Sequence, residues 1–258
     1  MKKLTFSALL LIGLFTVLPS LAHAQVLCQG VPATIVGTSG DDLLVGTPGD
    51  DVIHGLGGDD TIYGLGGDDI ICGGNGNDVI FAGGGNDTID GGRGRDKIFG
   101  ASGNDIIFGG RDNDIIFGGS DDDTIDGGPG DDRISGGQGD DVIDGGDGND
   151  FIGAGSGDDV VNGGEGNDVI GGGDGIDQLN GDDGNDVIHG GQDADTINGG
   201  AGNDVLSGGG GGDVINGDDG DDTIDGAGGD DTIDGGLGGD ICGGGGGLLD
   251  AVTCETVI

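Results

Sequence analysis

The chain has 258 residues, of which 72 are glycine and only 3% are aromatic, so it lacks the bulky apolar material for the wide core of a globular domain. Its formal charge of −43 opposes compaction and excludes nucleic acid and anionic membrane surfaces as expected partners. The charge indicates that the partners are cations. Such a composition is typical of disorder, but disorder needs no register, and this sequence has a strict one.

Residues 1–24 have the pattern of a secretory signal peptide. A basic start is followed by an apolar stretch from 4 to 21, and Ala22-His23-Ala24 is an A-x-A cleavage site. The alternative is a membrane anchor, but the apolar run is barely long enough to span a bilayer. We therefore expect cleavage before Gln25, a secreted extracellular protein and no membrane span. Because the removed segment carries two lysines and no acid, the remaining chain has a formal charge of −45.

Residues 25–39 precede the repeat, and Ile35 and Val36 give this predicted N-terminal cap the character of a strand. Residues 245–258 form the predicted C-terminal cap, in which Leu248, Leu249 and Val252 supply apolar cover for an open end. An even number of cysteines in an exported chain favours disulfides. Four cysteines allow three connectivities, and proximity along an extended array favours Cys28–Cys72 and Cys242–Cys254.

Residues 40–244 consist of one nine-residue unit written repeatedly. The copy from Gly145 to Gly153 reads Gly-Gly-Asp-Gly-Asn-Asp-Phe-Ile-Gly. An aspartate recurs at every ninth position from Asp42 to Asp240, which makes 23 aspartates in register. An aliphatic residue follows two positions after each of them, except that the last copy has Cys242. A fixed period of this kind predicts a repeat architecture.

Each unit divides into a turn and a short strand. Gly-Gly-x-Gly-x-Asp is typical of a turn because glycine permits positive φ, and the next three residues alternate as in a strand. Two units therefore make one coil, and about 11 coils stack so that residues 18 apart lie over one another. The interior would be two facing columns of mostly isoleucine, too narrow to offset the ordering cost of so much glycine.

The aspartates indicate where the missing stabilisation comes from. Stacking places Asp132 beside Asp150, and carboxylates held so close repel unless a cation lies between them. Carboxylates and turn carbonyls are the hard oxygen ligands that Ca²⁺ takes, whereas Mg²⁺ demands a tighter octahedron. A merely solvated acidic face is the alternative, but solvation requires no register.

The unit resembles the G-G-x-G-x-D-x-U-x nonapeptide of the RTX, or haemolysin-type, calcium-binding repeat family, over about residues 40–244. The resemblance implies an all-β fold, a parallel β-roll (a β-helix or solenoid) of about 23 nonapeptide repeats, with Ca²⁺ between successive turns on both sides. Many members carry an enzyme or toxin domain ahead of the repeats. No such domain is recognisable here, so toxicity and protease activity are not carried over.

The expected metal ligands are the aspartates of the regular copies, and those from Asp132 to Asp168 belong to the most regular run. One site per stacked pair gives at most about 21 Ca²⁺ ions, enough to offset nearly all of the negative charge. Copies with nearby cations, such as that of Asp96, are expected to lose sites. The expected ligands are Asp51, Asp60, Asp69, Asp78, Asp87, Asp105, Asp114, Asp123, Asp132, Asp141, Asp150, Asp159, Asp168, Asp177, Asp186, Asp204, Asp213, Asp222 and Asp231.

Four aromatic residues, Tyr63, Phe81, Phe99 and Phe117, recur every 18 residues and predict an outward ladder on one face, with Phe108 on the other. Such a ladder stabilises a sheet by cross-strand stacking. Alternatively, it is a docking stripe for an extracellular polymer or a surface protein, since contiguous exposed aromatics mark contact surfaces.

No catalytic constellation is recognisable, because the aspartates are equivalent to one another and acid–base chemistry needs groups in differing environments. We expect a protein that is not an enzyme but a structural or adhesive calcium-binding roll that folds when it binds Ca²⁺. The alternative is an accessory module of a polysaccharide-modifying or ice-binding system. Ice binding requires a regular threonine ladder, and the threonines here are scattered.

Overall fold

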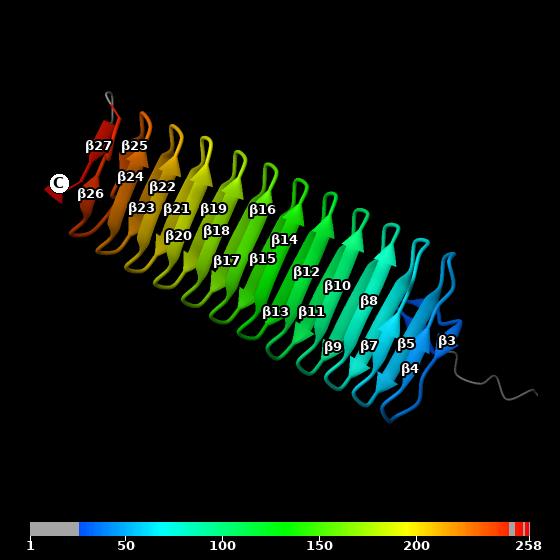
Figure 1. Cartoon of the computed structure of the whole chain (residues 1–258). Coiled ribbons are helices and arrows are strands. Elements are labelled where there is room, and N and C mark those ends of the chain that lie inside the picture. The colour runs from blue at the N-terminus through cyan, green and yellow to red at the C-terminus, as the bar shows by residue number, and fades with distance from the viewer. Residues whose placement is uncertain (1–25, 248–250, 255, 258) are drawn as a thin grey trace, which may run out of the picture.

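The structure is a computed structural model that describes residues 26–247, 251–254 and 256–257. Within these ranges the chain winds into a solenoid with two parallel sheets of 13 strands each, which face one another (Figure 1). The expected all-β parallel roll is therefore confirmed. The predicted signal peptide, residues 1–24, lies outside the described residues.

Consecutive strands alternate between the sheets, which we name the odd sheet and the even sheet after their strand numbers. The odd sheet contains β3 (Ile35–Val36), β5 (Val52–Gly57), β7 (Ile70–Asn75), β9 (Thr88–Arg93), β11 (Ile106–Arg111), β13 (Thr124–Pro129), β15 (Val142–Asp147), β17 (Val160–Glu165), β19 (Gln178–Asp183), β21 (Thr196–Ala201), β23 (Val214–Asp219), β25 (Thr232–Asp234) and β27 (Ala251–Thr253). The even sheet contains β4 (Leu43–Val45), β6 (Thr61–Tyr63), β8 (Val79–Gly84), β10 (Lys97–Ser102), β12 (Ile115–Ser120), β14 (Arg133–Gln138), β16 (Phe151–Ser156), β18 (Val169–Asp174), β20 (Val187–Gln192), β22 (Val205–Gly210), β24 (Thr223–Gly228), β26 (Ile241–Gly243) and β28 (Thr256–Val257).

The register of the sheets follows the sequence period. Phe151 of β16 pairs with Val169 of β18, and Ile152 pairs with Ile170, so residues 18 apart are neighbours. The middle residue of each strand triplet points inward, and Ile152 is 1% exposed whereas Phe151 beside it is 58% exposed. The core is therefore the predicted pair of aliphatic columns, one from each sheet.

The stack is longer than the regular repeat. Thirteen strands per sheet exceed the 11 coils expected, because β3 lies before the first regular copy and β27 and β28 lie after the last one. Ile35 and Val252 pack against the core although neither belongs to a regular copy. Residues assigned to the caps by sequence therefore continue the roll.

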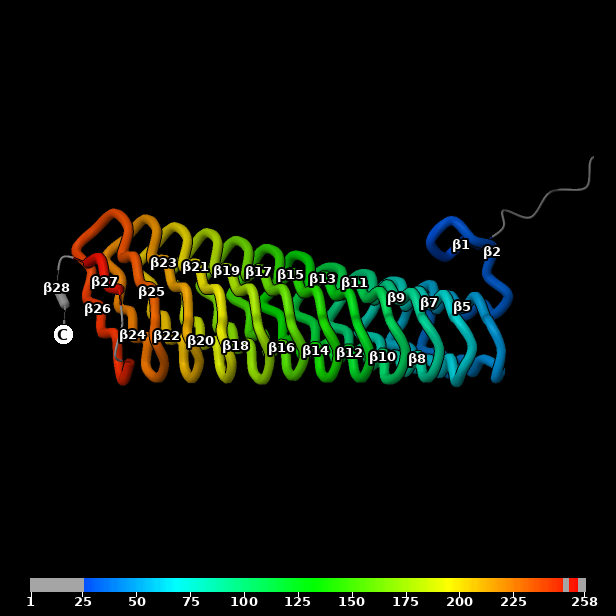
Figure 2. The backbone as a smooth tube through the Cα atoms, turned by 90° about the horizontal axis from the view of Figure 1, so that it is seen from above, coloured from blue at the N-terminus to red at the C-terminus, as the bar shows by residue number. Residues whose placement is uncertain are grey.

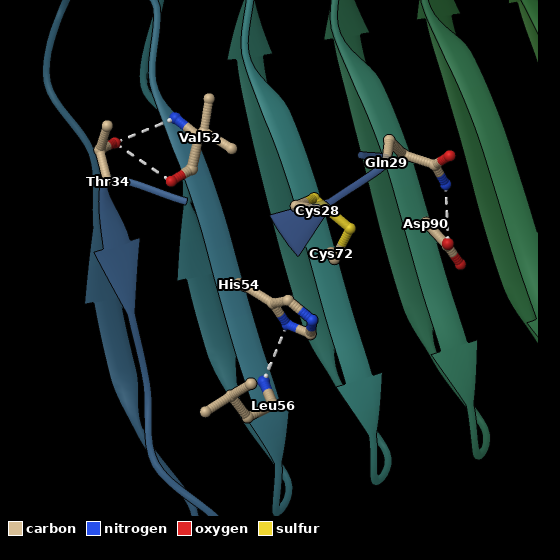
Figure 3. Close-up of a disulfide and its surroundings, with 8 residues drawn as sticks. All are labelled: Cys28, Gln29, Thr34, Val52, His54, Leu56, Cys72 and Asp90. Carbon is tan, nitrogen blue, oxygen red and sulfur yellow. Dashed lines mark hydrogen bonds between the residues drawn. A yellow bond between two sulfur atoms is a disulfide. The ribbon is translucent and has the colours of Figure 1, made fainter. Parts of the chain in front are cut away.

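The N-terminal hairpin of β1 (Leu27–Cys28) and β2 (Val31–Pro32) lies against the outer side of the odd sheet near β5 (Figure 2). The disulfide between Cys28 and Cys72 fastens it there, with Cα atoms 5.7 Å apart (Figure 3). Gln29 adds a hydrogen bond of 2.8 Å from its amide nitrogen to Asp90 Oδ2. Cys242 and Cys254 form the second disulfide, which joins β26 to the segment after β27. Both expected disulfides are present.

We predict that replacing Cys28 and Cys72 by serine releases the hairpin and leaves the roll folded. The hairpin has few other contacts with β5 and β7, whereas every coil is held by its own ladder of hydrogen bonds. Hydrogen exchange should then be fast in residues 26–33 and unchanged in residues 88–93. The matching replacement of Cys242 and Cys254 should leave residues 26–33 protected, and equal protection in both variants would refute the fastening role.

Candidate metal sites along the two edges

Each coil of the regular repeat has two turns, one at each edge of the roll, and each of these turns ends in a register aspartate. In the copy from Gly145 to Gly153, β15 leads through the turn at 148–150 into β16. Asp150 closes this turn and is only 2% exposed. Its carbonyl oxygen accepts a hydrogen bond from Val169 N–H at 2.9 Å, so its backbone is fixed by the next coil. The carboxylate is therefore held inside the turn.

One carboxylate oxygen of each register aspartate belongs to a continuous ladder. Asp132 N–H donates to Asp150 Oδ1, and Asp150 N–H donates to Asp168 Oδ1, both at 2.7 Å. The same bond recurs from Asp42 to Asp240 at 2.7–3.0 Å. A backbone N–H therefore links the stacked carboxylates that we expected to face one another directly.

The other oxygen, Oδ2, is buried without a hydrogen-bond partner among the described residues. A buried carboxylate oxygen without a donor or a cation is costly, because the group has lost its hydration. The aspartates with this geometry are Asp60, Asp69, Asp78, Asp87, Asp96, Asp105, Asp114, Asp123, Asp132, Asp141, Asp150, Asp159, Asp168, Asp177, Asp186, Asp195, Asp204, Asp213 and Asp222.

The first glycine of each unit leaves open the space that Oδ2 faces. A Cβ atom on Gly145 would lie 2.6 Å from Asp150 Oδ2 and 2.5 Å from the carbonyl oxygen of Gly163 in the next coil. A carboxylate oxygen and a carbonyl oxygen thus converge beside the glycine Cα. Glycine is required at the fourth position for a different reason, because a Cβ atom on Gly148 (φ 143°) would overlap the carbonyl oxygen of Gly130.

Burial raises the pKa of these carboxyls, and the neighbouring carboxylates raise it further, although the backbone N–H bond acts in the opposite direction. The pKa of Asp150 rises from 3.8 to about 7, and that of Asp96 to about 8. The pKa of Asp78, which lies nearer the N-terminal end, rises to about 6, and burial is again the largest cause. Without a cation, these turns therefore hold protons at far higher pH than an ordinary aspartate does.

The donors fit calcium better than a transition metal. They are oxygen atoms from one buried carboxylate and the turn carbonyls, and Ca²⁺ takes about six to eight such ligands. The described residues contain no group of three or more histidine, cysteine, aspartate or glutamate side chains at one point. An ion at a turn would therefore be held by few carboxylates, with carbonyl oxygens and water completing its shell.

The geometry separates some of the expected ligands from the rest. Asp51 is partly exposed, and its Oδ2 accepts a hydrogen bond from Thr47 N–H at 2.6 Å, so it lacks the unpaired oxygen. Asp96 and Asp195, which were not expected to serve, have the same buried geometry as the regular copies. Basic neighbours such as Lys97 therefore do not prevent this buried geometry, and ion binding at Asp96 and Asp195 stays a prediction.

Two natural substitutions lie at the glycine beside Oδ2. Ala82 and Ala154 occupy this position for Asp87 and Asp159, and both are fully buried. Their methyl groups occupy the space that glycine leaves open elsewhere. Asp159 therefore differs from its neighbours within the run that the sequence marked as most regular.

The residues before many of the register aspartates form an outer ladder that the sequence reasoning missed. Asn167 N–H donates to Asn149 Oδ1 at 3.0 Å, and Asn185 N–H donates to Asn167 Oδ1 at 2.9 Å. These bonds run in the opposite direction to the inner aspartate ladder. A further column of amides crosses the odd sheet at Asn162, Asn180, Asn198 and Asn216, with bonds of 2.7–2.9 Å. Recurrence of asparagine at intervals of 18 was the available signal.

A parallel roll with acidic glycine turns on both edges defines a class of protein, the calcium-binding repeat solenoids. The model of the RTX calcium-binding nonapeptide repeat matches in overlapping segments: residues 36–71, 66–98, 99–134, 117–152, 126–161, 135–170, 154–179, 171–206 and 207–242. The chain therefore belongs to the RTX calcium-binding repeat family. No curated protein matches it in sequence. The part of the chain that the structure describes has no helix able to cross a bilayer.

We predict that Gly145→Ala weakens calcium binding and destabilises the loaded roll by about 1–3 kcal/mol, because the methyl group collides with Asp150 Oδ2 and the Gly163 carbonyl. Gly153→Ala is the matched control, since a Cβ there meets nothing within 4 Å. Calorimetric calcium titration and urea unfolding would compare the two variants. Indistinguishable affinity and stability would show that the space beside Oδ2 is not used.

We predict that calcium-free protein gains folded structure as the pH falls. A carboxyl whose pKa is higher in the folded state binds protons more tightly there, so protonation favours folding. This stabilisation is complete below the ordinary value of 3.8 and is lost as the pH rises through about 6 to 8. Circular dichroism in chelator, between about pH 8 and about pH 5, would measure it. Stability that is constant or increases with pH across this window would contradict the prediction.

Proposed function

We propose that this protein is a secreted structural rod that folds when Ca²⁺ ions bind between its stacked turns. The observation that carries the proposal is the series of buried aspartates whose Oδ2 atoms have no hydrogen-bond partner in the described chain. One such group is tolerable in a protein, but a column of them on each edge is not, because each retains the cost of a desolvated charge. Cations at the turns offset that cost at every coil.

The charge of the chain supports the coupling between metal and folding. A formal charge of −43 over 258 residues keeps the metal-free chain expanded, since only seven residues are basic. The narrow aliphatic core adds little against this repulsion. Metal binding and folding then become one event, as in other small domains whose sites do not exist in the unfolded chain. The signal peptide predicted at residues 1–24 would direct secretion and so deliver the chain to an environment where calcium is abundant.

In this proposal calcium is a structural ion, and the chain's own residues fix the turns and hold the ions. The aspartate Oδ1 atoms fix the turns through backbone N–H groups, and their Oδ2 atoms with the turn carbonyls would hold the ions. The glycines keep that space open. We propose no catalytic role, because the turns present the same group in the same environment along the whole rod.

The aromatic ladder has a structural explanation. Tyr63, Phe81, Phe99 and Phe117 stack with ring centroids 4.8–5.1 Å apart and planes within 7°, so neighbouring rings lie parallel to one another. We propose that the ladder stabilises the first half of the even sheet. Docking of a polymer or surface protein on it stays a prediction. The outward threonines on the odd sheet alternate with residues such as Ile106, which gives the ice-binding alternative no support.

We predict that the chain without residues 1–24 gains β structure cooperatively as calcium is added, at about 10⁻⁴–10⁻³ M, which is typical of extracellular sites. Far-UV circular dichroism at neutral pH would follow the gain, with Mg²⁺ as the control ion. Light scattering should report contraction over the same range. A chain already folded in chelator at neutral pH would refute metal-coupled folding.

A further inference from the structure

The cations of this acidic rod are gathered in one place. Outside residues 1–24 the chain has five basic residues, namely Arg93, Arg95, Lys97, Arg111 and Arg133. They lie around the same edge of neighbouring coils. Arg93 and Arg111 are partners on β9 and β11, and Arg95 lies in the turn after β9. Lys97 lies on β10 and Arg133 on β14. None of their side chains forms an ion pair within the described residues. In a chain with 50 acidic residues, a cluster of basic residues that form no ion pairs with them needs an explanation.

A groove of about 640 Å³ runs along this edge of the even sheet. Lys97, Ile115, Arg133 and Phe151 follow one another as partners on β10, β12, β14 and β16, so cationic and apolar side chains alternate at the strand spacing of about 4.8 Å. The turn residues beside them are Arg95 and Asp131, which alternate with the amides of Asn77, Asn113 and Asn149. The volume is within the range of about 300–1,000 Å³ seen for sites that bind small molecules.

The acids that line the groove are occupied by other contacts. Asp96, Asp114 and Asp132 are register aspartates, 1% exposed, whose Oδ1 atoms accept backbone N–H groups. Asp131 is exposed, and it accepts hydrogen bonds from the Asn113 side chain at 3.3 Å and from the Asn149 backbone at 3.0 Å and side chain at 3.1 Å. The surface of the groove therefore offers three free cations, apolar side chains and amides.

We propose that this groove binds a short acidic carbohydrate chain. The guanidinium and ammonium groups of Arg95, Lys97 and Arg133 would bind carboxylate or sulfate groups, and arginine does so with paired hydrogen bonds. Phe151, 58% exposed, and Ile115 would contact the apolar faces of the sugar rings. The amides would bind hydroxyl groups.

The surroundings of the groove favour this occupant over other anions. A bare inorganic anion would not use the apolar side chains that alternate with the cations. A long, densely charged strand such as nucleic acid would extend over the acidic coils on either side and be repelled. A few sugar units with spaced charges meet neither difficulty, and the alternation at successive strands suits a ligand that repeats along its length.

The inference rests on the proposed calcium-dependent fold in one respect. The groove is assembled from coils that are 18 residues apart in sequence, so it exists only when the roll is folded. Bound calcium also removes negative charge from the turns below it. Circular dichroism of each sample before the binding measurement separates the two proposals, because failure to fold with calcium would be visible whether or not sugars bind.

The test is calorimetric titration of the calcium-loaded chain with an oligogalacturonate, a sulfated heparin oligosaccharide, a neutral cello-oligosaccharide and a single-stranded oligonucleotide. We expect one of the two acidic sugars to bind, and the arm that binds identifies carboxylate or sulfate as the recognised group. Equal binding of the neutral sugar, binding of neither acidic sugar, or tighter binding of the oligonucleotide would each overturn the proposal.

Two double variants sharpen the test. Lys97→Gln with Arg133→Gln removes two cations that line the groove, and we expect the dissociation constant to rise about tenfold or more. Arg93→Gln with Arg111→Gln removes two cations that lie outside it and should change the constant by less than about threefold. Phe151→Ser should weaken binding without changing the net charge. Equal losses in the two double variants would mean non-specific attraction and would refute a built site.

Discussion

The structure depends on a carboxylate that is only half satisfied. Each register aspartate from Asp60 to Asp222 offers one carboxylate oxygen to the backbone N–H of the previous coil and leaves the other buried without a donor among the described residues. The first contact holds the coils in register, and the second creates a demand for positive charge at every turn. The same side chain thus fixes the register of the coils and carries a buried charge that lacks compensation, and this combination is repeated along both edges. The proposed metal-coupled folding rests on this arrangement more directly than on the total charge.

The glycines serve that carboxylate rather than flexibility alone. The first glycine of each unit keeps the space beside Oδ2 open, as Gly145 does for Asp150, while the fourth-position glycine lets one turn approach the carbonyl of the turn below. Ala82 and Ala154 show that the first position tolerates a methyl group at the expense of that space. Asp112, Asp121 and Asp193 adopt positive φ at the fourth position, which shows that the turn geometry outlasts the loss of glycine.

The sequence predicted the fold closely because its period is strict. A nine-residue unit with one inward aliphatic residue allows only an 18-residue coil, so the register, the core columns and the aromatic ladder followed from counting. The strands at the two ends could not be predicted from the period, because β3 and β27 pair with the roll although Ile35 and Val252 lie outside any regular copy. The site was predicted in part. The aspartates were evident, but their N–H ladder, the paired Oδ2 of Asp51 and the buried, unpaired Oδ2 of Asp96 depend on which oxygen faces which neighbour, and the sequence pattern alone carries no such direction.

The alternation of strands between two sheets makes the parity of the repeat number significant. Inserting or deleting one nine-residue unit would transfer every later residue to the opposite sheet, whereas a change of 18 residues would leave each face as it was. Loss of a single unit between Phe117 and Arg133 would move Arg133 and Phe151 to the opposite sheet and so separate Arg133 from Lys97. The length of such a rod can therefore vary in evolution only by whole coils if its faces are to keep their identities.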